Sequence, residues 1–216
     1  LNSQPMGFYA PAQLGADARR HGIEVRPVDV LHSGQQSELE ADANGRTAIR
    51  LGLDRIKGLD TAAAERIVAW RKAIAGSTPS ENLKASLVQH AKLDRATMET
   101  PAAAGALASL SGNRHQAYWD ATGVEAPLPL LQHPEFDESR PLLASPSEAR
   151  DIVADYASLG LTLGRHPLAL LRRRLNALQV TPATHLKDTP DGMSITVAGL
   201  VINRQRPGTA SGVIFM

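Results

Sequence analysis

The sequence contains no cysteine, and none of its apolar runs is long enough to cross a bilayer. Without cysteine the chain forms neither disulfides nor thiolate metal sites, which is typical of a reducing compartment. A membrane-spanning helix needs about 20 consecutive apolar residues, and no basic segment followed by an apolar one opens the chain as a signal peptide would. Hydrophobic residues make up 43% and charged residues 21%, as in globular proteins. These features predict a cytoplasmic protein with no membrane partner.

The 216 residues suffice for one large domain or two small ones. The chain opens with Leu1 rather than methionine and stops at Met216 inside an apolar strand pattern. We therefore expect it to be a piece of a longer protein.

The net charge of +1 conceals an uneven distribution of charge. Residues 45–72 carry seven Lys/Arg against three Asp/Glu, and residues 156–187 carry five Lys/Arg and no acid. Between them, residues 124–155 carry seven acids against two Arg. Two basic blocks on either side of an acidic segment favour a polyanionic partner, although solvated helix faces give the same pattern.

Residues 56–60, Ile-Lys-Gly-Leu-Asp, form a turn between a segment with strand periodicity and a segment with helical periodicity. Residues 47–53 alternate as a half-buried strand does, and residues 61–75 show helical spacing with Asp60 or Thr61 as the cap. Gly58 permits a tight turn, and the N–H groups at the following helix start suit a phosphate. An ordinary strand-to-helix turn explains the same residues equally well.

A second turn at residues 104–107 also places a glycine, Gly105, between apolar residues ahead of a helical segment, residues 113–121. Two such turns in tandem are typical of helix-hairpin-helix modules that hold duplex DNA. Helices are predicted before this turn at residues 81–90 and 95–103, and Pro101 is expected to kink or shorten the second of them.

The remaining pattern predicts a mainly α fold with small β elements, of the α+β class. The expected helices are residues 12–21, 147–158 and 168–178, and the expected strands are residues 23–30, 38–40, 194–202 and a strand beginning at 213, with an Asn44-Gly45 hairpin turn.

Four ordered segments resemble the bacterial C-family DNA polymerases, and more narrowly the error-prone relatives of the DNA polymerase III alpha subunit. They are residues 2–9, residues 49–53 leading into 56–59, residues 161–168, and residues 197–201 followed by 204–209. The resemblance implies part of a DNA-directed DNA polymerase that acts in damage-induced translesion synthesis.

The resemblance also implies a domain order. It gives residues 1–35 as the end of the fingers, 36–123 as the tandem helix-hairpin-helix domain, 124–146 as an acidic Pro-rich linker, 147–189 as a helical connector and 190–216 as the start of an OB-fold.

Catalysis in this family uses two Mg²⁺ ions held by palm carboxylates, which the resemblance places upstream of Leu1. We therefore expect no catalytic residue and no metal ligand in this chain. The implied role is sequence-independent binding of duplex primer-template DNA. The implied DNA-binding residues are Lys57, Gly58, Leu59, Asp60, Thr61, Gly105, Ala106, Arg114, Arg204 and Arg206.

Two departures from the family pattern bear on partners and affinity. Asp60 stands where the hairpin usually has a second glycine, which puts a carboxylate near the expected phosphate. Residues 127–131, Pro-Leu-Pro-Leu-Leu, lack the glutamine and aromatic anchor of a sliding-clamp peptide. An accessory mutagenesis protein, and the clamp only indirectly, are the expected partners.

Two other functions remain open from the sequence. One is a stand-alone helix-hairpin-helix DNA-binding or repair accessory protein, against which the helix-strand unit at residues 1–31 argues. The other is a scaffold whose basic blocks bind acidic proteins, and only the charge pattern supports it.

Overall fold

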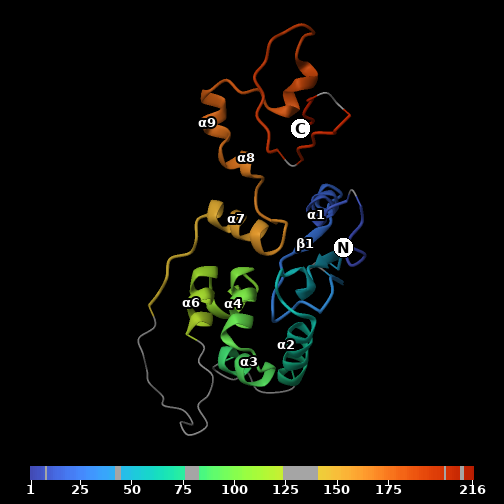
Figure 1. The fold of residues 1–216 in the computed structure, drawn as a ribbon. Coiled ribbons are helices and arrows are strands. Elements are labelled where there is room, and N and C mark those ends of the chain that lie inside the picture. Colours follow the sequence, from blue (N-terminus) through green and yellow to red (C-terminus); the bar gives the residue numbers. More distant parts are fainter. Residues whose placement is uncertain (8, 42–44, 76–82, 124–140, 202, 210–211) are drawn as a thin grey trace. The chain divides into compact units, whose positions relative to one another are not determined.

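The computed structural model describes residues 1–216 except 8, 42–44, 76–82, 124–140, 202 and 210–211 (Figure 1). The chain forms two compact units, Leu1–Gly164 and Arg165–Met216. The boundary falls inside the expected connector at residues 147–189, so the first part of that connector belongs to the first unit.

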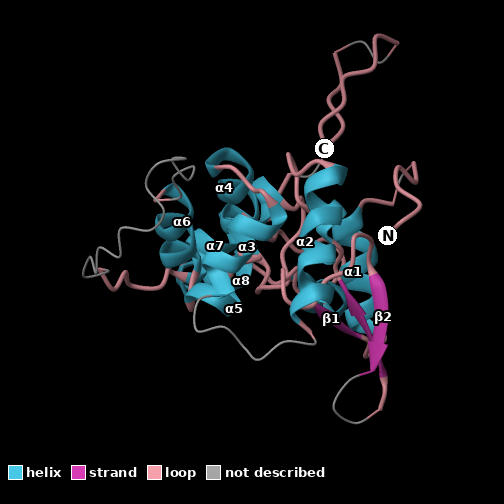
Figure 2. Ribbon diagram, turned by 90° about the horizontal axis from the view of Figure 1, so that it is seen from below, coloured by secondary structure: helices cyan, strands magenta, loops and turns pink. Residues whose placement is uncertain are grey.

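The first unit contains a three-stranded sheet beside the helices α1 (Pro11–Arg20) and α2 (Thr61–Ile74) (Figure 2). The strand order is β1 (Glu24–Arg26), β3 (Thr47–Arg50), β2 (Glu38–Ala41). β1 runs parallel to β3, and β2 pairs with β3 antiparallel, with Ala41 opposite Thr47. The antiparallel pairing confirms the predicted hairpin, while its Asn44 lies outside the described residues.

Two strands are shorter than predicted. β1 ends at Arg26 because Pro27 has no N–H to donate to the sheet, and Val28 and Val30 are buried in a loop instead. β3 ends at Arg50 rather than residue 53, since Leu53–Arg55 forms the 3-10 helix η1. This tight turn of helix leads the chain into the Gly58 turn and α2.

The rest of the first unit is mainly helical, and its helices were predicted except the short one at Ala108–Ser111. The helices are α3 (Leu83–Ala91), α4 (Arg95–Ala103), α5 (Ala108–Ser111), α6 (Arg114–Thr122) and α7 (Glu148–Ser158). α2 packs on α3, α4 packs on α6, and α7 contacts α4. One buried cluster joins the sheet, both glycine turns and the segment after α7. Among the described helices, none is long and apolar enough to cross a membrane.

α4 continues through Pro101, which is buried, and ends two residues later at Ala103. The Pro101 carbonyl accepts the Ala106 N–H at 2.9 Å, and the Ala102 carbonyl accepts the Gly105 N–H at 3.0 Å. This pair of bonds is a Schellman motif with glycine in the left-handed position. Pro101 therefore lies in the last turn of the helix, where its missing N–H costs one hydrogen bond.

The second unit contains α8 (Pro167–Leu170), α9 (Arg172–Ala177) and the 3-10 helix η2 (Ala183–Asp188). The single helix predicted at residues 168–178 is split at Leu171. The strands predicted at 194–202 and from 213 are wrong for the described residues, where only an isolated bridge joins Gln205 and Phe215. An extended segment becomes a strand only when a neighbour pairs its N–H and C=O groups.

Candidate nucleic-acid interface

The first glycine turn is shaped by backbone conformation rather than by crowding. Gly58 has φ +84°, and a Cβ added there would meet nothing closer than Thr100 Cγ2 at 3.8 Å. The Leu59 N–H donates to the Ile56 carbonyl at 3.3 Å, and the half-buried Leu59 side chain packs on the core. Glycine is therefore needed here for its positive φ, and Leu59 anchors the turn.

The start of α2 presents unused N–H donors. Among the described residues, the N–H groups of Gly58, Asp60, Thr61 and Ala62 make no hydrogen bond, and all four residues are exposed. The Asp60 side chain caps the helix by accepting the Ala63 N–H at 2.6 Å. Exposed donors at the positive end of a helix suit an anion, while the Asp60 carboxylate opposes one.

Lys57 is exposed, but both its N–H and its side-chain ammonium are hydrogen-bonded within the chain. Its N–H donates to the Ser158 carbonyl at 2.8 Å, and its Nζ donates to the carbonyls of Tyr156 at 3.0 Å and Ala157 at 3.1 Å. These carbonyls form the last turn of α7, where a cation is favourable. Lys57 therefore fastens the first turn to the carboxyl end of α7.

The second turn uses the N–H groups of Gly105 and Ala106 internally, and their assignment to DNA binding stays a prediction. Both N–H groups belong to the Schellman motif that ends α4, and the buried Ala106 accepts the Val30 N–H at 3.0 Å. Gly105 has φ +76°, and a Cβ there would lie 2.9 Å from Arg114 Nη2. Glycine is required at this position for both conformation and space.

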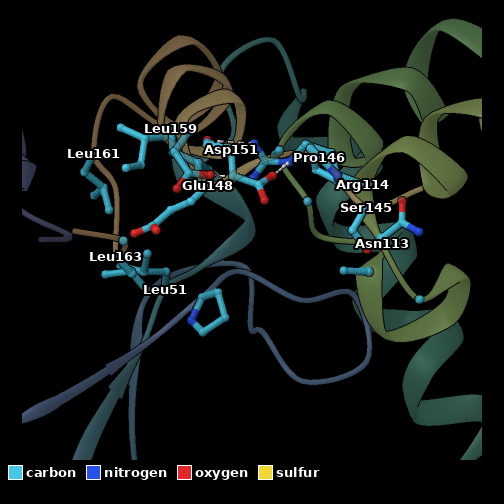
Figure 3. A pocket seen from close by; sticks show the side chains of 18 residues that line it. Leu51, Asn113, Arg114, Ser145, Pro146, Glu148, Asp151, Leu159, Leu161 and Leu163 are labelled. Carbon is cyan, nitrogen blue, oxygen red and sulfur yellow. Dashed lines mark hydrogen bonds and ion pairs between the residues drawn. The ribbon is translucent and has the colours of Figure 1, made fainter. Parts of the chain in front are cut away.

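Arg114 also has internal partners, and its expected DNA contact stays a prediction. Its Nη1 donates to the Asp151 carbonyl at 3.0 Å, its Nη2 pairs with the Asp155 carboxylate, and its Nε lies 3.4 Å from Asp151 Oδ1. The side chain is 15% exposed. Figure 3 shows Arg114 and Asp151 turned toward each other from facing elements. The guanidinium is thus paired with two acidic residues of α7.

This ion pair forms one wall of a pocket of about 510 Å³ in the first unit (Figure 3). The opposite side is apolar and includes Leu51, Leu161 and Leu163. The pocket mixes acids, one arginine and leucines, so it does not resemble a basic groove for nucleic acid. Among the residues that the structure describes, no group of three or more His, Asp or Glu side chains could hold a metal ion.

Arg204 and Arg206 lie in the second unit and are exposed on both sides of Gln205. Gln205 and Phe215 exchange two backbone hydrogen bonds of 2.9 Å, which fixes this loop locally. Among the described residues, Arg204, Arg206 and the N–H groups at the start of α2 thus remain as candidates for contact with DNA. Ala62 is a donor that the sequence reasoning missed, although every helix leaves its first N–H groups unpaired.

Comparison with known proteins shows which proteins this chain resembles. A family model described as a helix-hairpin-helix motif matches residues 22–117, a range that takes in both glycine turns. The error-prone DNA polymerase of Alkalilimnicola ehrlichii is 50% identical over 216 residues, which cover 100% of this chain and 21% of that protein. The chain corresponds to a segment of the error-prone DNA polymerases.

Other error-prone DNA polymerases align along the whole chain in the same way. The one from Methylococcus capsulatus is 45% identical and the one from Azoarcus sp. is 49% identical, with 22% and 20% of their lengths covered. The chain therefore spans about one fifth of the length of the curated relatives it matches. The resemblance to error-prone DNA polymerases, drawn from four short segments, is confirmed.

Proposed function

We propose that this chain is the part of an error-prone DNA-directed DNA polymerase that holds duplex primer-template DNA during translesion synthesis. The observation that carries the proposal is the set of exposed, unbonded N–H groups at Gly58, Asp60, Thr61 and Ala62. They lie within the residues that match a helix-hairpin-helix motif. Nucleotidyl transfer is assigned to the parent polymerase, and no residue of this chain is given a catalytic role.

Binding through backbone N–H groups explains why the affinity for duplex DNA would not depend on the DNA sequence. The donors meet phosphate oxygens, which every nucleotide carries, while the bases are untouched. The positive end of the α2 dipole adds to the attraction, and the Asp60 carboxylate reduces it. We therefore expect a moderate affinity suited to a polymerase that moves along its template.

In the parent enzyme two Mg²⁺ ions would activate the primer 3′-hydroxyl and hold the incoming triphosphate. The residues described here do not fit such ions, since none of their His, Asp and Glu side chains form a suitable cluster. We therefore assign the metal ligands to the remainder of the polymerase.

The partners proposed besides DNA are an accessory mutagenesis protein and, through it, the sliding clamp. The degenerate motif at residues 127–131 supports this indirect route, and it lies outside the described residues. Action on bacterial DNA would place the protein in the cytoplasm.

The test is a fluorescence-anisotropy titration of the full chain with duplexes of unrelated sequence. We expect one dissociation constant for all of them, about 10⁻⁴ to 10⁻⁶ M near physiological salt. The informative variant is Thr61→Pro, which deletes one N–H at the first helical position, where proline is tolerated. Asp60 already has φ −74° and ψ 155°, which a following proline accepts.

The matched control is Thr61→Ala, which removes the side chain and keeps the N–H. A hydrogen bond to a charged phosphate predicts that Thr61→Pro binds every duplex roughly ten-fold more weakly than Thr61→Ala. Equal affinities of the two variants would show that the α2 amides do not hold the DNA.

A further inference from the structure

α7 joins the exposed first turn to the helix that follows the second turn. At its carboxyl end, the Ser158, Tyr156 and Ala157 carbonyls accept three hydrogen bonds from Lys57. On its flank, Asp151 and Asp155 bind Arg114 at the start of α6 (Figure 3). Lys57 and Arg114, two of the four cations predicted to bind DNA, therefore both contact the same helix.

This helix is an integral part of the first unit rather than a removable cover. Ile152 is 3% exposed, and the chain just after the helix buries Leu159 and Leu161. Leu159 and Leu161 belong to the same core cluster as Ile56 of the first turn and Ala106 of the second. Displacing α7 would expose that core, so it does not act as a detachable competitor of DNA.

The contacts around Asp155 control where the last turn of α7 lies. Its carboxylate pairs with Arg114 and accepts the Thr162 hydroxyl at 2.6 Å. Its carbonyl accepts the Leu159 N–H at 2.7 Å, and the next residue, Tyr156, offers a carbonyl to Lys57. A shift of Asp155 therefore moves the carbonyls that hold the backbone immediately before Gly58.

We propose that Arg114, Asp155 and Asp151 are positioning residues for the first turn, and that the DNA-holding module extends to Gly164. The proposal rests on the proposed function, because the turn is taken as the phosphate site. Arg114 fixes α7, and α7 fixes Lys57. Lys57 in turn sets the direction of the free N–H groups of Gly58, Asp60, Thr61 and Ala62. A site that already has its bound geometry loses less binding free energy to the ordering of its backbone and side chains.

The decisive variant is Asp155→Asn in the full chain, because electrostatics and positioning predict opposite signs. Removing an acid raises the positive charge and by itself tightens DNA binding. Positioning predicts instead that duplex affinity falls roughly two- to thirty-fold, the range for residues that act through intermediate contacts. The matched control is Glu65→Gln, an exposed acid on α2, which should bind as tightly as the parent or slightly more tightly. Asp155→Asn binding as tightly as Glu65→Gln would overturn the proposal.

The salt dependence separates positioning by Arg114 from direct contact. Each phosphate contact made by a cation contributes about one unit to the slope of log affinity against log salt. Arg114→Ala should therefore weaken binding by the same factor at every salt concentration and leave the slope unchanged. Arg114→Lys, which keeps an ion pair with Asp155, should recover part of the affinity. A slope about one unit shallower in Arg114→Ala would contradict the proposal.

Amide hydrogen exchange tests the arrangement without DNA. In Asp155→Asn the Lys57 amide, which donates to Ser158, should exchange faster, while amides in the middle of α2 stay protected. Unchanged protection of the Lys57 amide would refute positioning whether or not DNA binds. A parent chain that binds no duplex would refute the proposed function alone, and the exchange result would still decide this inference. If Asp155→Asn does not fold, Asp151→Asn, 41% exposed, serves for both measurements.

Discussion

The Asp60 carboxylate stabilises α2 and opposes a phosphate at the same helix end, so its substitution should separate stability from binding. Asp60→Asn keeps an oxygen that can accept the Ala63 N–H, now 2.6 Å away, and removes the charge. Asp60→Ala removes both, and Asp60→Gly restores the residue that the family pattern usually has. Three variants at one position therefore distinguish the cap from the charge.

The expected changes in stability and in duplex affinity follow from these two roles of the Asp60 carboxylate. Losing an N-cap to alanine costs about 1 kcal/mol, losing it to glycine costs a few tenths of a kcal/mol, and asparagine caps about as well as aspartate. Two unit charges about 6 Å apart in water repel by about 0.7 kcal/mol, which corresponds to roughly three-fold in affinity. Asp60→Asn should thus bind duplex DNA about three-fold more tightly at unchanged stability. Asp60→Ala should also bind more tightly and unfold more easily.

The assay is fluorescence anisotropy at two salt concentrations combined with thermal unfolding of each variant. The gain in affinity of Asp60→Asn should shrink at high salt, because the Debye length falls to about 3 Å at 1 M. Glu65→Gln changes the net charge equally at a neighbouring place on α2. If Glu65→Gln gains as much as Asp60→Asn, the effect is one of net charge. If Asp60→Asn gains nothing, no phosphate lies at this helix end.

Three further outcomes are expected. Gly58→Val should lower both duplex affinity and stability, the latter by about 1–3 kcal/mol, since a β-branched residue is strained at positive φ; an unchanged melting temperature would contradict the turn geometry. Gly105→Ala should destabilise the chain by a similar ~1–3 kcal/mol because its Cβ would lie 2.9 Å from Arg114 Nη2, which a urea titration measures. Burial alone would raise the pKa of Asp120, but hydrogen bonds led by that from Lys84 outweigh it and lower the pKa below its usual range. The stability from Asp120 is therefore complete above the usual carboxyl pKa and lost as pH falls through the lowered one, so Asp120→Asn should flatten the acid side of a stability-against-pH curve.

Local patterns determined much of the fold and identified the family. The predicted helices in the first unit appear within a few residues of their expected ends, because their caps and periodicity act over neighbouring residues only. Asp60, one of the two residues predicted to cap it, caps α2, and Ser147, the first residue of the predicted helix, caps α7. The two glycine turns adopt positive φ at Gly58 and Gly105, and the error-prone DNA polymerase resemblance holds along the whole chain.

The tertiary structure alone decided which of the predicted site residues are free. Lys57 and Arg114 look like exposed cations in the sequence, yet their partners on α7 lie 99 and 41 residues away, at Tyr156 and Asp155. The amides of Gly105 and Ala106 close the end of α4, whereas those of Asp60 and Thr61 remain unbonded within the described chain. A sequence shows which groups can bind a phosphate, but whether an internal partner has already satisfied them depends on contacts between segments that only folding brings together.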